Sequence, residues 1–145
     1  MVLDLKSTKV HTTFENKWNI TPADLDGLLS KDKNQFVIFN TPANPTGSSY
    51  DENELKELAK VLNVERTIVM SDEIYNDLSF DPSMRHLSIS KFLKDKTVIT
   101  SAISKCHGAG GWRLGYAIIP DELSELRDVI LKVASETYSA VAAPI

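Results

Sequence analysis

Residues 101–116 read Ser101-Ala-Ile-Ser-Lys105-Cys-His-Gly-Ala-Gly-Gly-Trp-Arg113-Leu-Gly-Tyr116. This stretch lies between two apolar runs, Thr97–Thr100 and Tyr116–Ile119, which are typical of short strands. The glycines at positions 108, 110 and 111 permit backbone turns that a Cβ atom would forbid. The stretch is therefore predicted to be a loop that joins two strands.

This loop carries two cationic side chains whose chemistry suits ligand binding. Lys105 is a candidate amine nucleophile, able to form a Schiff base with a carbonyl compound. Arg113 is a candidate fork for a phosphate or carboxylate group. The alternative is a surface loop with two solvated cations, and the stretches upstream help to decide between the two interpretations.

Two further apolar runs upstream, Phe36–Phe39 and Thr67–Met70, have the continuous apolar character of strands buried on both faces of a parallel sheet. Between them, Asp51 and Glu54 are spaced as a helix capping box, and leucines recur after it at helical spacing. This alternation predicts an α/β fold with three layers: a mainly parallel sheet with helices on both faces.

Two more helices are expected from their start signals. Thr21, Pro22 and Asp24 predict a helix that runs to about Leu29. Pro120 and Asp121 predict a last helix, whose core face is expected to hold four apolar residues: Leu123, Leu126, Ile130 and Val133.

Polar residues follow three of the predicted strands at their carboxyl ends. Asn44 lies in a Pro-rich turn after the first strand, Asp72 follows the second, and Lys105 follows the third. Ligands of open parallel sheets collect at this edge. We therefore expect these residues, together with Tyr75 and Arg113, to converge on one site.

Composition narrows the class of protein. The chain has 145 residues, a net charge of −4 and 42% hydrophobic residues, which is typical of one globular domain and gives no electrostatic footprint for nucleic acid. No apolar run approaches the ~20 residues of a membrane span, and no signal peptide is visible at the N-terminus. The single cysteine, Cys106, excludes an internal disulfide and fits a cytoplasmic location.

Three stretches together resemble the class I/II aminotransferases, which are fold-type I enzymes that use pyridoxal 5′-phosphate (PLP). They are Asn44-Pro-Thr-Gly47, Ser71-Asp-Glu-Ile-Tyr75, and Ser104-Lys105 followed by Gly111-Trp-Arg113-Leu-Gly-Tyr116. Each is weak evidence alone, but their order and spacing make the set specific. The resemblance implies amino-group transfer between an L-amino acid and a 2-oxo acid through a lysine Schiff base.

The resemblance also assigns roles to individual residues. Lys105 resembles the lysine that holds PLP and moves protons at the substrate Cα, and Asp72 resembles the carboxylate that faces the pyridine nitrogen. Tyr75 and Asn44 resemble the two donors to the phenolic oxygen of the cofactor. Arg113 and Ser104 resemble the ligands of its phosphate group.

Some of these roles have alternatives. Asp72 could only cap a turn, Tyr75 could be a core aromatic residue, and Asn44 could only stabilise its Pro-rich turn. Many relatives have a hydroxyl residue three positions before the lysine, where this chain has Ala102, so Ser101 is a second candidate phosphate ligand. Cys106 and His107 are adjacent, but two residues do not make a metal site.

The family's chains are much longer than this one. Residues 1–145 are therefore expected to be part of the PLP-binding large domain, without its N-terminal part and without the C-terminal small domain. The full-length protein is expected to be a homodimer, and the isolated chain is expected not to transaminate. The alternatives are a PLP-dependent lyase or synthase of the same fold, and a folded module without catalysis.

Overall fold

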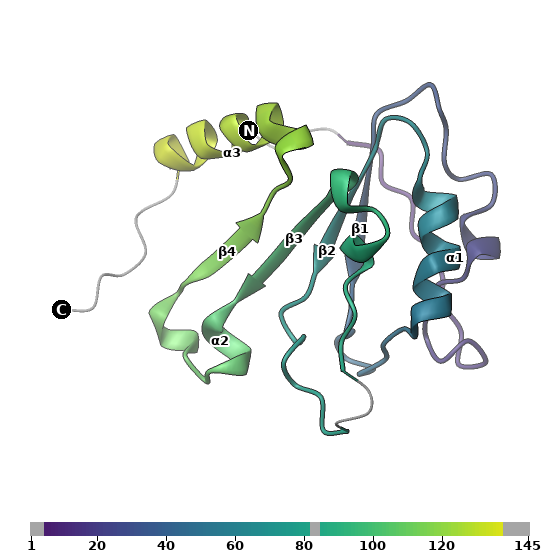
Figure 1. The fold of residues 1–145 in the computed structure, drawn as a ribbon, viewed down its shortest axis with the longest axis horizontal. Helices are drawn as coiled ribbons and strands as arrows, with labels where there is room; N and C mark the ends of the chain where they lie inside the picture. Colours follow the sequence, from purple (N-terminus) through teal and green to yellow (C-terminus); the bar gives the residue numbers. More distant parts are fainter. Residues whose placement is uncertain (1–4, 82–84, 138–145) are drawn as a thin grey trace.

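The computed structural model describes residues 5–81 and 85–137 and is built around one four-stranded sheet (Figure 1). The strands lie in the order β1 (Gln35–Asn40), β2 (Thr67–Asp72), β3 (Thr97–Ala102) and β4 (Gly115–Ile118). Strands β1, β2 and β3 are parallel, and β4 pairs with β3 in the antiparallel sense. The predicted α/β class with a mainly parallel sheet is confirmed, and each of the four apolar runs forms a strand.

Helix α1 (Glu52–Leu62) covers one face of the sheet and lies beside β1 in Figure 1. Its start is the predicted capping box: the Asp51 carboxylate accepts from the amide of Glu54, and the Glu54 carboxylate accepts from the amide of Asp51. Its apolar stripe is fully buried with Phe39 of β1 and Val69 of β2, and consists of Leu55, Leu58, Ala59 and Leu62. This contact forms the hydrophobic core.

The opposite face of β1 is uncovered. Successive side chains of a strand point to opposite faces, so Phe36 and Ile38 lie on the side away from α1. They are 53% and 68% exposed. The expectation that this strand is buried on both faces is therefore wrong for β1, because a continuous apolar run does not reveal whether a second layer covers it.

The C-terminal helix α3 (Ser124–Thr137) follows the short 3-10 helix η5 (Asp121–Leu123) and lies apart from α1, beyond the end of β4 (Figure 1). None of its residues is buried, and Ile130 and Val133 are exposed. The predicted helix is present, but the prediction that it turns a face to the core is wrong, because α3 lies beyond the end of β4 and away from the core under α1.

The first predicted helix is shorter than expected. Thr21 and Asp24 form the predicted cap, with the Thr21 amide donating to the Asp24 carboxylate at 2.7 Å, and the 3-10 helix η1 (Pro22–Leu25) follows. It ends before Leu29 because Asp26 is extended and Gly27 adopts a left-handed φ of +68°. Leu25 still reaches the core.

Short helical turns connect the remaining strands. Between β2 and β3 lie η2 (Ile89–Lys91) and η3 (Lys94–Lys96), and Ile89 is buried in the core. Between β3 and β4 lie α2 (Ile103–Cys106) and η4 (Gly110–Trp112), so the Gly-rich stretch is the predicted connection between two strands.

We expect Leu55→Ala to lower the free energy of unfolding of the purified chain by roughly 2–5 kcal/mol, the usual cost of a cavity in a packed core. Leu55 is fully buried, whereas Leu131 of α3 is 61% exposed and serves as the matched control. Leu131→Ala should change the free energy by less than about 0.5 kcal/mol. Urea denaturation followed by circular dichroism measures both, and equal losses would contradict the assignment of the core to the α1 side.

Candidate functional site

The predicted site residues lie at one edge of the sheet. Asp72 is the last residue of β2, Lys105 lies in α2 directly after β3, and Asn44 lies in the turn that follows β1. Asn40, Asp72 and Thr100 are aligned across the three parallel strands. The carboxyl ends of these strands therefore meet at the same edge, where Figure 1 shows α2.

Asn44 and Tyr75 join the loops that follow β1 and β2. The Asn44 side-chain Nδ2 donates to the Tyr75 hydroxyl oxygen at 3.1 Å. The Asn44 amide donates to Oδ1 of Asn40 at 3.1 Å, and Gly47, with a left-handed φ of +69°, closes the turn by donating its amide to the Ala43 carbonyl. The Pro-rich turn therefore holds Asn44 against the β2 loop.

Lys105 contacts the same tyrosine. Its Nζ lies 5.6 Å from the centroid of the Tyr75 ring, within the range of a cation–π interaction. The structure thus brings Asn44, Tyr75 and Lys105 together from the ends of three different strands. This is the part of the predicted convergence that direct contacts demonstrate.

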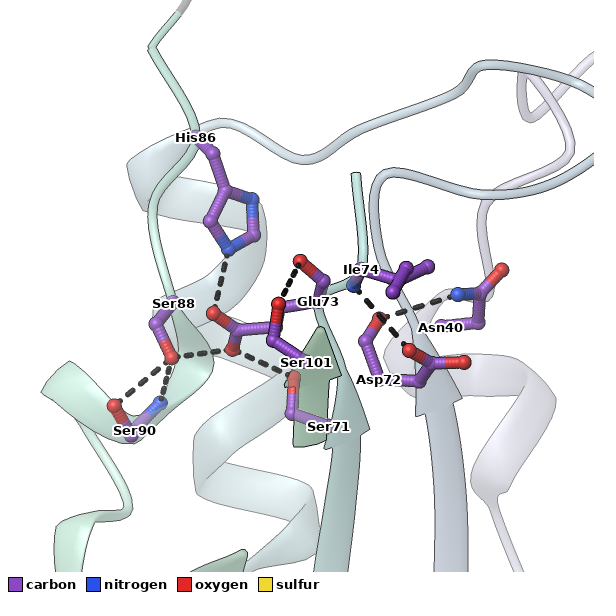
Figure 2. Close-up of polar contacts among 9 residues, drawn as sticks. All are labelled: Asn40, Ser71, Asp72, Glu73, Ile74, His86, Ser88, Ser90 and Ser101. Carbon is purple, nitrogen blue, oxygen red and sulfur yellow. Dashed lines mark hydrogen bonds and ion pairs between the residues drawn. The ribbon is translucent and has the colours of Figure 1, made fainter. Parts of the chain in front are cut away.

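Asp72 is fixed through its backbone (Figure 2). Its carbonyl oxygen accepts a hydrogen bond from Nδ2 of Asn40 at 3.1 Å, which Figure 2 shows, and another from the amide of Thr41 at 3.1 Å. Its carboxylate accepts from the amide of Ile74 at 3.3 Å. That last contact is the bond expected if Asp72 caps a turn. Capping does not exclude a second role in ligand binding, because a carboxylate accepts several hydrogen bonds.

Arg113 and Ser104 are not joined to the other residues by contacts. Arg113 has a left-handed φ of 54°, and its guanidinium donates to the carbonyl of Gly110 within the same loop. Ser104 is half-buried next to Lys105. Ser101, the second candidate phosphate ligand, is buried and donates to the carbonyl of Glu73 at 3.5 Å, so its hydroxyl is engaged on the backbone that follows β2.

A buried carboxylate next to Asp72 is a feature that the sequence analysis missed. The side chain of Glu73 is 4% exposed. It accepts hydrogen bonds from the hydroxyls of Ser71 at 2.8 Å and Ser88 at 2.6 Å, and it pairs with Nε2 of His86 at 2.9 Å (Figure 2). His86 and Ser88 lie 13 and 15 residues further along the chain, a distance at which no local sequence pattern indicates pairing.

The surroundings of Glu73 determine its charge. Burial raises the pKa of the carboxyl, but hydrogen bonds from His86, Ser88 and Ser71, together with the attraction of His86, hold the pKa below its ordinary value. Glu73 is therefore ionised at neutral pH. An ionised carboxylate can only accept hydrogen bonds, so Nε2 of His86 carries a hydrogen atom.

The described residues contain neither a metal-binding cluster nor a membrane-spanning helix. In residues 5–81 and 85–137, no group of three or more His, Cys, Asp or Glu residues could hold a metal ion. The thiol of Cys106 lies 2.8 Å from Nδ1 of His107 and donates to the carbonyl of Ala102 at 3.6 Å. No helix in this part of the chain is long and apolar enough to span a membrane. A surface cavity of about 500 Å³ lies between residues 15–22 and the start of α1, and no predicted site residue lines it.

Comparisons with known proteins identify the family of this chain. The family described as aminotransferase class I and II matches residues 3–145. The aspartate aminotransferase of Bacillus subtilis (strain 168) is 39% identical over 106 residues, which cover 71% of this chain and 26% of the relative. The chain spans about a quarter to a third of the length of the curated relatives it matches.

Solved structures show the same likeness. An aspartate aminotransferase double mutant from Thermus thermophilus superposes with a TM-score of 0.81 at 25% identity, over 92% of this chain and 34% of that one. The aromatic aminotransferase from Pyrococcus horikoshii OT3 gives 0.76 at 29% identity, over 90% of this chain and 35% of that one.

The lowered pKa of Glu73 leads to a prediction about pH. A carboxyl whose pKa is lower in the folded state stabilises the fold above its unfolded pKa, and this stabilisation is lost as the pH falls through the folded pKa. We expect Glu73→Gln to lower the free energy of unfolding by roughly 1–3 kcal/mol at pH 7. Below the ordinary glutamate value of 4.5, the difference from the wild type should shrink.

Chemical denaturation of the purified chain at a series of pH values measures this difference. Glu65→Gln is the matched control because Glu65 is an exposed glutamate just before the other end of β2. The control should show little effect at any pH. A Glu73→Gln difference that persists unchanged well below pH 4.5 would contradict an ionised, hydrogen-bonded Glu73.

Proposed function

The chain belongs to the class I and II aminotransferase family, and from this membership we propose that it is part of a PLP-dependent enzyme that moves an amino group between an L-amino acid and a 2-oxo acid. Residues 1–145 belong to its PLP-binding large domain. The observation that carries the proposal is the contact of Asn44 and Lys105 with Tyr75 at the carboxyl edge of the parallel sheet.

The donor set suits PLP. The cofactor has an aldehyde, a pyridine nitrogen, a phenolic oxygen and a phosphate group, and the chain has an amine, a carboxylate, a pair of neutral donors and a guanidinium. The amide of Asn44 and the hydroxyl of Tyr75 lie within one hydrogen bond of each other, so both can address a single oxygen atom. These residues fit the group.

PLP, when bound, supplies an electron sink for the bonds at the amino acid Cα. Lys105 would hold the cofactor through its aldehyde carbon, with the aldehyde oxygen leaving as water, and would carry a proton to or from Cα. The charge of Asp72 would keep the proton on the pyridine nitrogen, and Asn44 and Tyr75 would donate to the phenolic oxygen. Arg113 and Ser104 would bind the phosphate group, for which the planar guanidinium is well suited.

The partners of the proposed enzyme are its two small-molecule substrates and a second copy of the full-length protein. Apolar side chains on β1, β4 and α3 are exposed, as is typical of surfaces that associate, and they include Ile38, Ile118 and Leu131. We place the enzyme in the cytoplasm, for which the use of a single cysteine is suitable.

Lys105 is expected to be the residue that binds PLP covalently. Incubating the full-length protein with PLP should produce imine absorbance, and borohydride reduction followed by peptide mapping should locate the label on Lys105. Lys105→Ala should lose the label, while Lys31→Ala, at an exposed lysine of the loop before β1, should keep it. A label on other lysines with Lys105 unmodified would contradict the proposed function.

Asp72 is expected to matter for turnover more than for cofactor affinity. Asp72→Ala in the full-length protein should lower kcat by about 10²-fold or more, the scale of losing a preorganised charge beside a reacting group. The affinity for PLP should change much less, because the phosphate ligands remain. Steady-state kinetics and PLP titration measure both effects.

Asp32→Ala is the matched control, since Asp32 is exposed in the loop before β1. It should leave both quantities unchanged. An Asp72→Ala enzyme with wild-type kcat would show that Asp72 only caps the turn through the amide of Ile74.

A further inference from the structure

Two consecutive carboxylates at the end of β2 have opposite surroundings. The side chains of neighbouring strand residues point to opposite faces, so Asp72 and Glu73 diverge at the point where the chain leaves the sheet. Asp72 is half-buried at the candidate site, whereas Glu73 is buried and engaged by three side chains. The proposed function uses Asp72 and leaves Glu73 without a role.

The Glu73 carboxylate closes a loop. Ser71 lies on β2, two residues before Glu73. His86 and Ser88 lie at the far end of the segment that connects β2 to η2. Hydrogen bonds from all three converge on the two carboxylate oxygens (Figure 2). Ser88 also bonds Ser90 of η2, so the carboxylate links the beginning and the end of this segment to an ordered turn.

The same residue fixes the backbone on which the site depends. The amide of Glu73 donates to the carbonyl of Thr100 on β3, and its carbonyl accepts from the hydroxyl of Ser101 and from the amide of Asn76. The bond to Asn76 forms the turn that contains Tyr75. The side-chain and backbone hydrogen bonds of Glu73 therefore hold one residue, which lies between Asp72 and the turn that contains Tyr75.

The cluster is not a hydrolytic relay. Ser88 donates to the carboxylate and not to His86, so the histidine of this cluster does not contact the serine hydroxyl as it does in a Ser-His-Asp triad. The carboxylate lies between the two side chains and is buried. This arrangement suits holding a loop and does not activate a nucleophile.

We propose that Glu73 is a positioning residue, whose hydrogen bonds to Ser71, His86 and Ser88 hold the segment after β2 so that Asp72 and Tyr75 face the cofactor. This inference rests on the proposed function. It assigns Glu73 no contact with cofactor or substrate, and its effect on turnover therefore acts through Asp72 and Tyr75.

The first test requires no cofactor. Hydrogen–deuterium exchange of the PLP-free full-length protein should be about tenfold faster or more for the amides of residues 74–78 in Glu73→Gln than in wild type, which corresponds to a loss of roughly 1.4 kcal/mol in local opening. The amides of α1 should keep their rates, and Glu65→Gln should match the wild type throughout. Equal exchange in Glu73→Gln and Glu65→Gln would overturn the inference.

The second test is a double-mutant cycle with Asp72→Asn in the PLP-loaded enzyme. Glu73→Gln should lower kcat about tenfold when Asp72 is present, with KM changed less than about twofold, and should lower kcat much less when Asp72 is already Asn. Glu73→Gln should shift the pH dependence of the absorbance of bound PLP when Asp72 is present, and should not shift it in the Asp72→Asn enzyme. Equal losses of kcat in both backgrounds would overturn the inference, since Glu73 would then act independently of Asp72.

A second variant pair covers the case in which Glu73→Gln does not fold. Ser88→Ala removes one donor to the carboxylate, and Ser88→Thr keeps the hydroxyl. Ser88→Ala should speed exchange of residues 74–78 and lower kcat, and Ser88→Thr should restore both. A wild-type protein that takes up no PLP would overturn the proposed function instead, and the exchange rates would still decide whether Glu73 holds the segment.

Discussion

The backbone of Asp72 and Glu73 is held from both sides, and the arrangement of the site depends on this constraint. The Asp72 carbonyl accepts hydrogen bonds from Thr41 and Asn40, which follow or end β1, while the Glu73 amide donates to Thr100 of β3. Parallel pairing thus continues to the last residue of β2, and the loops of three strands leave the sheet at one level. Asn44 and Lys105 can meet Tyr75 only because these strand ends are aligned.

The two faces of the sheet differ in how far they are covered. The face under α1 buries leucines against β1 and β2, and burial of this kind is the main favourable contribution to folding, at about 25 cal/mol per Å² of apolar surface. The other face of β1, together with β4 and α3, leaves apolar side chains in water, including Phe36 and Ile118. The candidate site lies at the edge between these faces, so its side chains need not take part in the core.

The predictions from sequence succeeded where the determining contacts are local. The strands and the cap of α1 were predicted because apolar runs and the Asp51–Glu54 spacing carry their own signal. The length of η1 was wrong because Gly27 ends it, and the burial of α3 was wrong because periodicity identifies an apolar face but not the element that covers it. The Glu73 cluster was missed because its partners lie 13 and 15 residues away.

Holding a loop with a buried carboxylate costs the free energy of desolvating a charge. The advantage is that the hydrogen bonds of the carboxylate are directional. Transfer of a charge out of water is unfavourable unless hydrogen bonds replace those to the solvent, and Ser71, His86 and Ser88 supply them. An apolar side chain at this position could pack in several ways, because dispersion contacts have little directional preference. Three hydrogen bonds to two oxygens have narrow preferences in distance and angle, and they fix His86 and Ser88 relative to Ser71 and Glu73. Each of the three donors favours the charged form of Glu73, and this couples the positions of His86 and Ser88 to the residue beside Asp72.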